Sequence, residues 1–169
     1  MKKIRISSYC IILCVICQVF TCYPTFAITE AQNDAISDGC TSIHNTLKTI
    51  QSQDSRTRVY LGGYYEKFLS KFITPLNLRL VKNNLSNTEL TANQTSFATA
   101  RADFVDDFID YQKSLEDLLA INCKTEPAAF YDKLKIVREK RETMAKDVTR
   151  LKGLISSHIK AVEKMREEL

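Results

Sequence analysis

Two histidines and two isolated cysteines are the residues of this chain best suited to chemistry. His44 and His158 could each transfer a proton or bind a metal ion, and a thiol at Cys40 or Cys123 could act as a nucleophile or a ligand. The sequence offers these residues no CxxC pair, zinc spacing, calcium loop, Gly-rich phosphate loop or nucleophile motif. We therefore expect no enzyme activity, no metal site and no cofactor.

The N-terminal 27 residues have the pattern of a cleaved secretory signal. Three basic residues within the first five positions precede the apolar run 11–20, and the small residues Thr25 and Ala27 offer a cleavage site. One alternative is an uncleaved membrane anchor, although the run is shorter than the roughly twenty residues that a span needs. Another is a lipid anchor on Cys22, which lacks the usual small residue before it.

Removal of this signal changes the charge and the cysteine count. It leaves 21 Lys and Arg against 20 Asp and Glu, a net charge of about +1, so the overall charge no longer indicates nucleic-acid binding. Four of the six cysteines lie within the signal. The remaining pair, Cys40 and Cys123, is the count expected for one disulfide in an exported protein.

Apolar residues recur at alternating spacings of four and three in the C-terminal forty residues, which predicts a helix at about 126–168. A helix with one narrow apolar stripe is not stable alone, so other helices must cover it. Only Arg141 and His158 interrupt the series. Its apolar members are Phe130, Leu134, Val137, Met144, Val148, Leu151, Ile155, Val162, Met165 and Leu169.

The same spacing predicts two earlier helices, at about 36–83 and 87–121, after a short lead-in at 28–35. In the first helix the phase continues across the polar stretch 51–58, which favours one long helix with polar residues inside its stripe. The stripe of this helix is Ile36, Cys40, Ile43, Leu47, Ile50, Asp54, Thr57, Leu61, Tyr64 and Phe68.

Short connections between long helices favour antiparallel neighbours. The predicted fold is therefore all-α, a long antiparallel three-helix bundle or coiled-coil hairpin that forms a single domain over residues 28–169. The alternative is a four-helix bundle in which the first helix breaks near Ser52.

The cysteines help to separate these two models. On an unbroken first helix, Cys40 lies about 12 Å along the axis from the level of Cys123, whereas a reversal near Ser52 would separate them by roughly 25 Å. A disulfide needs its α-carbons about 4.4 to 6.8 Å apart. The unbroken model requires only a bend near Gly39 or a frayed end of the second helix. In this model His44 and His158 fall near opposite ends of the bundle.

Four aspartates share one side of the second helix. We interpret them as a charged face that fixes the helix register against basic residues at the same level of the third helix, rather than as a cation site or a merely solvated face. The acidic members are Asp103, Asp106, Asp107 and Asp110. The basic members are Arg138, Lys140, Arg141 and Lys146.

An aromatic and basic cluster in the first helix is a candidate interface, or else packing where Gly62-Gly63 lets a neighbour approach. The apolar run that follows, 72–81, is wider than one stripe needs, which suggests a second contact surface. The candidate interface residues are Arg56, Arg58, Tyr60, Tyr64, Tyr65, Phe72 and Leu76.

The stretches DSRTRVYL at 54–61 and KFITPLNLRLVKNN at 71–84 resemble a group of short, secreted, uncharacterised helical proteins of reduced-genome candidate-phylum bacteria. The resemblance covers the whole chain after the signal and implies bacterial export, with no known activity.

These patterns favour an exported, non-catalytic protein that acts through protein contact or self-association at the cell envelope or surface. The alternative is an envelope chaperone or membrane-surface binder that uses the apolar hairpin tip around 72–81. Nucleic acid is not an expected partner.

Overall fold

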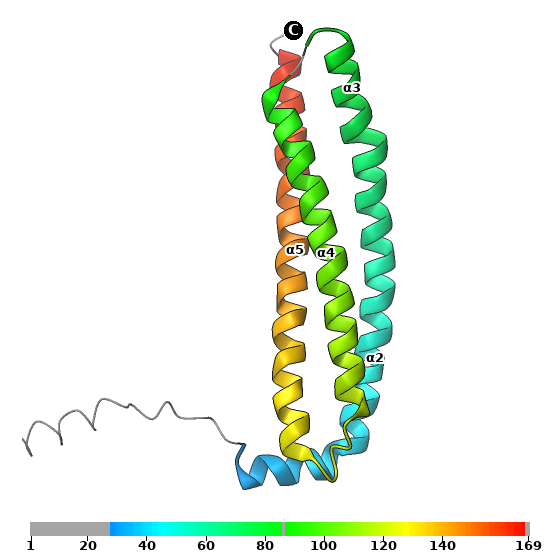
Figure 1. Ribbon diagram of the computed structural model, residues 1–169, viewed down its shortest axis with the longest axis vertical. Coiled ribbons are helices and arrows are strands. Elements are labelled where there is room, and N and C mark those ends of the chain that lie inside the picture. Colours follow the sequence, from blue (N-terminus) through cyan, green and yellow to red (C-terminus); the bar gives the residue numbers. More distant parts are fainter. Residues whose placement is uncertain (1–27, 86, 168–169) are drawn as a thin grey trace, which may run out of the picture.

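The computed structural model describes residues 28–85 and 87–167. Three helical rods lie side by side with antiparallel neighbours, and these residues contain no β-strand (Figure 1). The predicted three-helix bundle is therefore confirmed, and the break near Ser52 is wrong because the helix continues through 51–58. The predicted signal lies outside the described residues. The elements are α2 (Glu30–Phe68), a π-helical turn η1 (Leu69–Ile73), α3 (Thr74–Lys82), α4 (Thr88–Ala120) and α5 (Pro127–Glu167).

The first helix begins earlier than its apolar pattern suggests. Thr29 caps α2: its hydroxyl accepts from the backbone N–H of Gln32, and the Gln32 side chain accepts from the backbone N–H of Thr29. This reciprocal capping satisfies free donors of the first turn. Residues 30–35, expected as a lead-in, are therefore helical. The first turns of α2 lie across the lower end of the bundle before the helix turns upward (blue to cyan in Figure 1).

A wide turn separates α2 from α3 without ending the rod. Within η1, the backbone N–H of Thr74 bonds to the carbonyl of Leu69, five residues back. Pro75 follows directly, and a proline in a regular helix would lack its N–H and crowd the carbonyl four residues earlier. The π-helical turn therefore lets the rod pass the proline. The rod ends where Asn84 adopts a left-handed φ of 57°.

Caps and turn residues define the other two rods. The Asn87 side chain accepts from the backbone N–H of Leu90 at 3.1 Å, which starts α4. That helix ends at Ala120, since Ile121 has extended backbone. Pro127 then opens α5, a favourable place for proline because the first helical N–H has no partner within the helix.

The buried core follows the length of the bundle and is supplied very unequally. α4 contributes nine buried residues within its 33, whereas α2 contributes only Leu47 and Tyr65 within its 39. α4 and α5 also form the closest pair of helices. The bundle is therefore a tight α4–α5 pair with the α2–η1–α3 rod laid against it.

Candidate interaction surface

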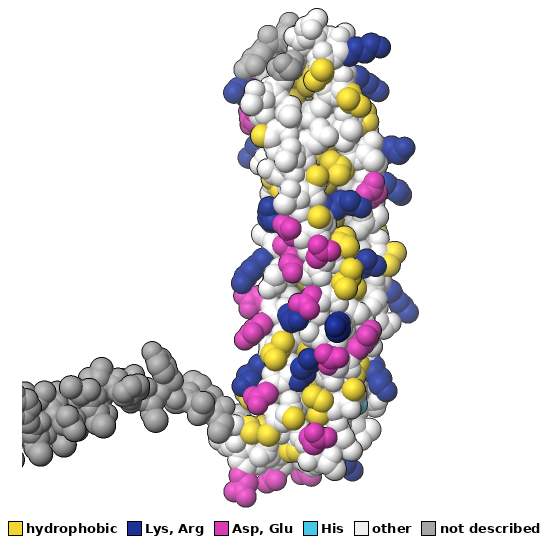
Figure 2. Space-filling view, viewed as in Figure 1, with side chains coloured by type: hydrophobic (Ala, Val, Ile, Leu, Met, Phe, Trp, Pro, Cys, Tyr) yellow, Lys and Arg dark blue, Asp and Glu magenta, His cyan; other side chains and the backbone are white. Residues whose placement is uncertain are grey.

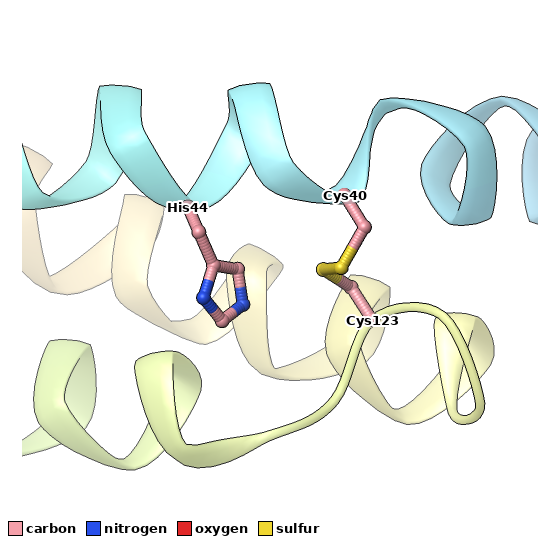
Figure 3. Close-up of side chains that lie close together, drawn as sticks. All are labelled: Cys40, His44 and Cys123. Atoms are coloured by element: carbon pink, nitrogen blue, oxygen red, sulfur yellow. A yellow bond between two sulfur atoms is a disulfide. The ribbon is translucent and has the colours of Figure 1, made fainter.

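The two cysteines form a disulfide at the lower end of the bundle, next to His44 (Figure 3). The α-carbons of Cys40 and Cys123 are 5.5 Å apart, because Cys123 follows the end of α4 in the extended turn while the first turns of α2 cross below. This disulfide confirms the pairing predicted from the cysteine count.

His44 completes a group of three possible metal ligands whose atoms lie within 4.8 Å of one another. Its ring stacks on Phe130 at 5.7 Å between centroids. The sulfurs of Cys40 and Cys123 are bonded to each other, so neither can act as a thiolate ligand in this state. The group therefore works as a covalent fastening of α2 to the α4–α5 turn.

His158 lies in the upper half of the bundle, within α5. Its ring meets the edge of Phe68 at 6.0 Å between centroids, and burial lowers the pKa of the imidazole. The apolar surroundings of His158 therefore favour the neutral form of its imidazole. The two histidines lie in different parts of the bundle, and they do not form a shared acid–base pair.

A polar network fastens the middle of α2 to both other helices. Asp54 accepts hydrogen bonds from Arg141 Nε at 2.8 Å and from the Tyr111 hydroxyl at 2.8 Å. Burial alone would raise the pKa of Asp54, but the bonds from Arg141 and Tyr111 outweigh burial and lower that pKa. Asp54 and Arg141, the polar residues that interrupt the apolar stripes of α2 and α5, are therefore bonded to each other.

The acidic side of α4 bonds to α5, but only one of its ion pairs joins two of the expected residues. Asp110 bonds to Lys140 at 2.6 Å, and Asp103 bonds to Arg150 at 2.7 Å. Arg141 is not a partner of this face because its guanidinium turns to Asp54 on α2. The remaining expected members, Asp106, Asp107 and Arg138, form no ion pair within the described residues, and Lys146 pairs within α5 to Glu142.

A buried carboxylate between α4 and α5 was not anticipated from the sequence. Asp147 is 8% exposed, and its Oδ2 has no hydrogen-bond partner. Burial, together with charge repulsion from the carboxylate of Asp107, raises the pKa of Asp147 to about 6. Its position in a run of charged and polar residues gave no sign of burial.

An aromatic row follows α2, η1 and α3, with members four residues apart in the chain. The ring of Phe68 stacks on those of Tyr64 and Phe72, at 6.4 and 5.9 Å between centroids. Tyr65 is a correction to the candidate interface, because it is 1% exposed and packs edge-on against the core ring of Phe104. We call the following residues the aromatic row: Tyr60, Tyr64, Phe68 and Phe72. Leu76 continues the spacing, but it is half-buried against the core at Leu80 and Leu90.

The aromatic row belongs to a surface rich in exposed apolar side chains. Of the ten exposed large apolar side chains in the described part of the chain, six lie between Val59 and Val81. Among them, Tyr60 is 73% exposed and Phe72 is 62% exposed. A β-carbon added at Gly62 or Gly63 would meet no atom within 4 Å, so the packing explanation for these glycines is not supported within this chain.

The basic side chains of the same segment form no ion pair within the described residues, although the guanidinium of Arg58 lies over the ring of Phe108 at 5.2 Å from its centroid. Between residues 55 and 82 there are six basic residues and one acidic residue, Glu66, which pairs with Arg101 of α4. Each of the seven ion pairs in the described residues takes its basic member from α4 or α5. Basic side chains accordingly follow the edge over α2 and α3 in Figure 2. The six basic residues of the segment 55–82 are Arg56, Arg58, Lys67, Lys71, Arg79 and Lys82.

Three hollows lie between the α2–η1–α3 rod and α5, and we call them together the trough. The lower and middle hollows, of about 530 and 580 Å³, have α2 and α5 as walls and α4 as floor, with Tyr111 below and Phe108 above. The upper hollow, of about 380 Å³, lies between the aromatic row and Ile159 of α5. The trough is mainly apolar, since side chains such as Leu61, Phe72 and Val148 line it.

Comparison of the chain with protein-family models, curated proteins and solved structures finds no match. Within the described residues, none of the helices has the length and apolar character needed to cross a membrane. The surface itself therefore provides the grounds for a functional proposal.

Proposed function

We propose that this chain is an exported, non-catalytic helical protein that acts through protein contact at the cell envelope or surface, as a scaffold, spacer or oligomer subunit. The observation that carries the proposal is the concentration of exposed apolar and unpaired basic side chains on the α2–η1–α3 rod. Contiguous apolar patches rimmed by polar groups are typical of interaction sites, and aromatic and arginine side chains often contribute most of the binding energy.

The export part of the proposal has separate support. The Cys40–Cys123 disulfide is consistent with an oxidising compartment outside the cytoplasm, where such bonds persist. The signal-like pattern of residues 1–27 indicates the same route.

Binding to intact cells of the source organism tests the proposal. We expect purified, labelled protein to bind saturably, and the double variant Tyr64→Ser/Phe72→Ser to lose most of that binding. Ile109→Ser is the matched control, because Ile109 is a comparably exposed apolar residue on α4 (55% exposed). Protease treatment of the cells should abolish binding if the partner is a protein. Equal binding by all variants would refute the role of this surface.

A membrane-surface or chaperone role is the second candidate. The observation that favours it is the exposure of Phe72, Leu78 and Val81 beside Arg79 and Lys82, since basic and apolar side chains together suit an anionic lipid interface. Flotation with anionic liposomes and suppression of client aggregation would support this role. Absence of both effects would remove it.

A further inference from the structure

We infer that the trough binds an acidic amphipathic helix of a partner protein, which occupies the place of a fourth helix beside α2, α4 and α5. The inference rests on the proposed function and specifies the chemistry of the partner. Three observations carry it: the shape of the trough, the charges along its walls and the state of the acidic groups elsewhere on the bundle.

The shape of the trough fits a rod. Its walls come from α2 and α5, and its floor in the lower two hollows comes from α4, through Phe104, Phe108, Tyr111 and Leu115. Helices that pack together lie about 8–10 Å apart and interlock their side chains. The floor side chains are already buried, so a helix laid along the trough would cover the half-buried apolar side chains of its walls, such as Leu61, Met144 and Val148, as in other helix-in-groove complexes. A flat bilayer surface, unlike a single helix, could not enter this concave face.

The charges along the trough select an acidic partner. Four of its basic side chains form no ion pair within the described residues: Arg58, Lys71, Arg79 and Arg138.

The acidic side chains of the trough are mostly engaged. Asp54 is bonded to Arg141 and Glu142 to Lys146, which leaves Glu163 as the one acidic lining residue with no ion pair among the described residues. The walls therefore present an excess of positive charge to whatever enters. Complementary charge fixes orientation and disfavours partners of like charge.

A second copy of this chain fits the trough less well. The acidic side of α4 already bonds to α5 through Asp103, Asp110 and Asp117. Its exposed large apolar side chain in the described residues is Ile109 alone, so this side offers no apolar stripe to cover the trough. The occupant that we infer is therefore a separate protein with its own apolar stripe and free carboxylates.

A pair of synthetic helices provides a direct test with the oxidised protein. Both peptides carry the same leucine stripe, and their polar positions are filled with Glu in one and Lys in the other. We expect the Glu peptide to bind in fluorescence anisotropy and the Lys peptide to bind at least about tenfold more weakly. Equal binding of both peptides, or no binding of the Glu peptide, would overturn the inference.

Charge reversal in the trough should invert this preference. The variant Lys71→Glu/Arg79→Glu should weaken the Glu peptide about tenfold and strengthen the Lys peptide. Lys67→Glu/Lys82→Glu is the matched control, because it makes the same charge change on the same rod at positions that do not line the hollows. An equal effect of the two variants would show that general charge, not the trough, attracts the peptide.

A bulky side chain that fills the trough tests the apolar contact with the peptide without changing the charge of the protein. Ala145 lines the middle hollow, and Ala145→Trp should abolish binding of the Glu peptide, whereas Ala102→Trp at an exposed site of α4 should not. Melting curves establish that each variant is folded, and the charge reversal remains decisive if the tryptophan variant is not. Unchanged binding by folded Ala145→Trp would overturn the inference.

The outcomes also distinguish this inference from the proposed function. If cells still require Tyr64 and Phe72 for binding but neither peptide binds, the proposed function stands and the acidic helix is refuted. If anionic vesicles bind and the Glu peptide does not, the partner is a lipid surface and the inference is again overturned. If the purified protein is a dimer whose association is lost in Ala145→Trp, the occupant is a second copy.

Discussion

The α4–α5 pair and the α2–η1–α3 rod contain similar aromatic and basic residues but place them differently. In the pair, aromatic side chains such as Phe97 and Phe130 are fully buried, and charged side chains bond across the helices. In the rod, Tyr60 and Phe72 are exposed, and the basic residues between 55 and 82 form no ion pair within the described residues. The pair also exposes Ile109, Ile136 and Ile159, but the rod presents more of its apolar side chains to the surface.

This difference indicates a division of labour. The pair supplies most of the buried apolar surface, which is the main favourable contribution to folding. The rod is fastened to it at particular points, notably the Cys40–Cys123 disulfide and the Asp54 network, and leaves a trough along its other side. Weakening these fastenings should therefore affect the rod more than the pair.

Removal of the disulfide should have the largest effect. Replacing Cys40 and Cys123 by alanine should lower the free energy of unfolding by about 4 to 5 kcal/mol, because the bond closes a loop across 83 residues of sequence separation. Hydrogen exchange should show that the start of α2 loses protection before α4 and α5 do. Uniform loss of protection would contradict the division between rod and pair.

Loss of the polar network should come next. Asp54→Ala leaves the buried Tyr111 hydroxyl and the Arg141 guanidinium without their acceptor, and should cost about 2 to 3 kcal/mol in chemical denaturation. In a double-mutant cycle with Arg141→Met, the two losses should be strongly non-additive. Simple additivity would show that Asp54 and Arg141 do not act together.

The buried carboxylate should make the pair respond to acid. The pKa of Asp147 is about 6 when folded and 3.8 in its ordinary state, so the folded protein binds more protons between these values. Its contribution to stability is fully present below pH 3.8 and is lost as the pH rises through about 6. Asp147→Asn should therefore stabilise the protein by about 1 to 2 kcal/mol at neutral pH, where wild type carries the repulsion.

Thermal melts across this pH range test whether stability rises or falls on acidification. Wild type should gain stability on moderate acidification, and Asp147→Asn should lack that gain. The lowered pKa of Asp54 acts in the opposite direction, since its contribution is lost only as the pH falls below its usual range. A wild type that loses stability steadily from neutral pH downward would contradict the burial of Asp147.

The smallest effect concerns a glycine of the rod. Gly63→Ala should raise stability by about 0.5 to 1 kcal/mol, because the new methyl group meets no atom within 4 Å and glycine disfavours helix. The same variant in the cell-binding assay shows whether the partner approaches at this point. A loss of stability would contradict this expectation, because it would require a close internal contact at position 63.

The heptad phase was enough to predict the number and continuity of the helical rods, but it missed the first turns of α2, at residues 30–35. It was less successful for individual side chains late in the first helix, where it assigned Tyr64 to the stripe and the structure buries Tyr65 instead. An undistorted α-helix drifts by about 20° per heptad relative to a 3.5-residue repeat, so after four heptads the neighbouring residue faces the core. The spacing alone does not contain this drift.

The sequence also could not predict which side chains pair with each other. Counting along the helices places Arg141 level with the aspartates of α4, but it cannot tell which of two neighbouring helices the side chain faces. The burial of Asp147 and the depth of the trough depend on the distances between helices, which the apolar pattern does not encode. The cysteine pairing could be predicted because only Cys40 and Cys123 lie outside the predicted signal.

Site-specific photocrosslinking in the source cells tests the outward-facing role of the rod most directly. A photoreactive phenylalanine analogue placed at position 72, on the rod, is compared with the same group at position 109, on α4; both native side chains are well exposed. We expect one discrete protein adduct from position 72, with an acidic helical segment at the crosslinked site, and none from position 109. Adducts of the same identity and yield from both positions, or adducts to lipid alone, would contradict the rod as the protein-binding surface.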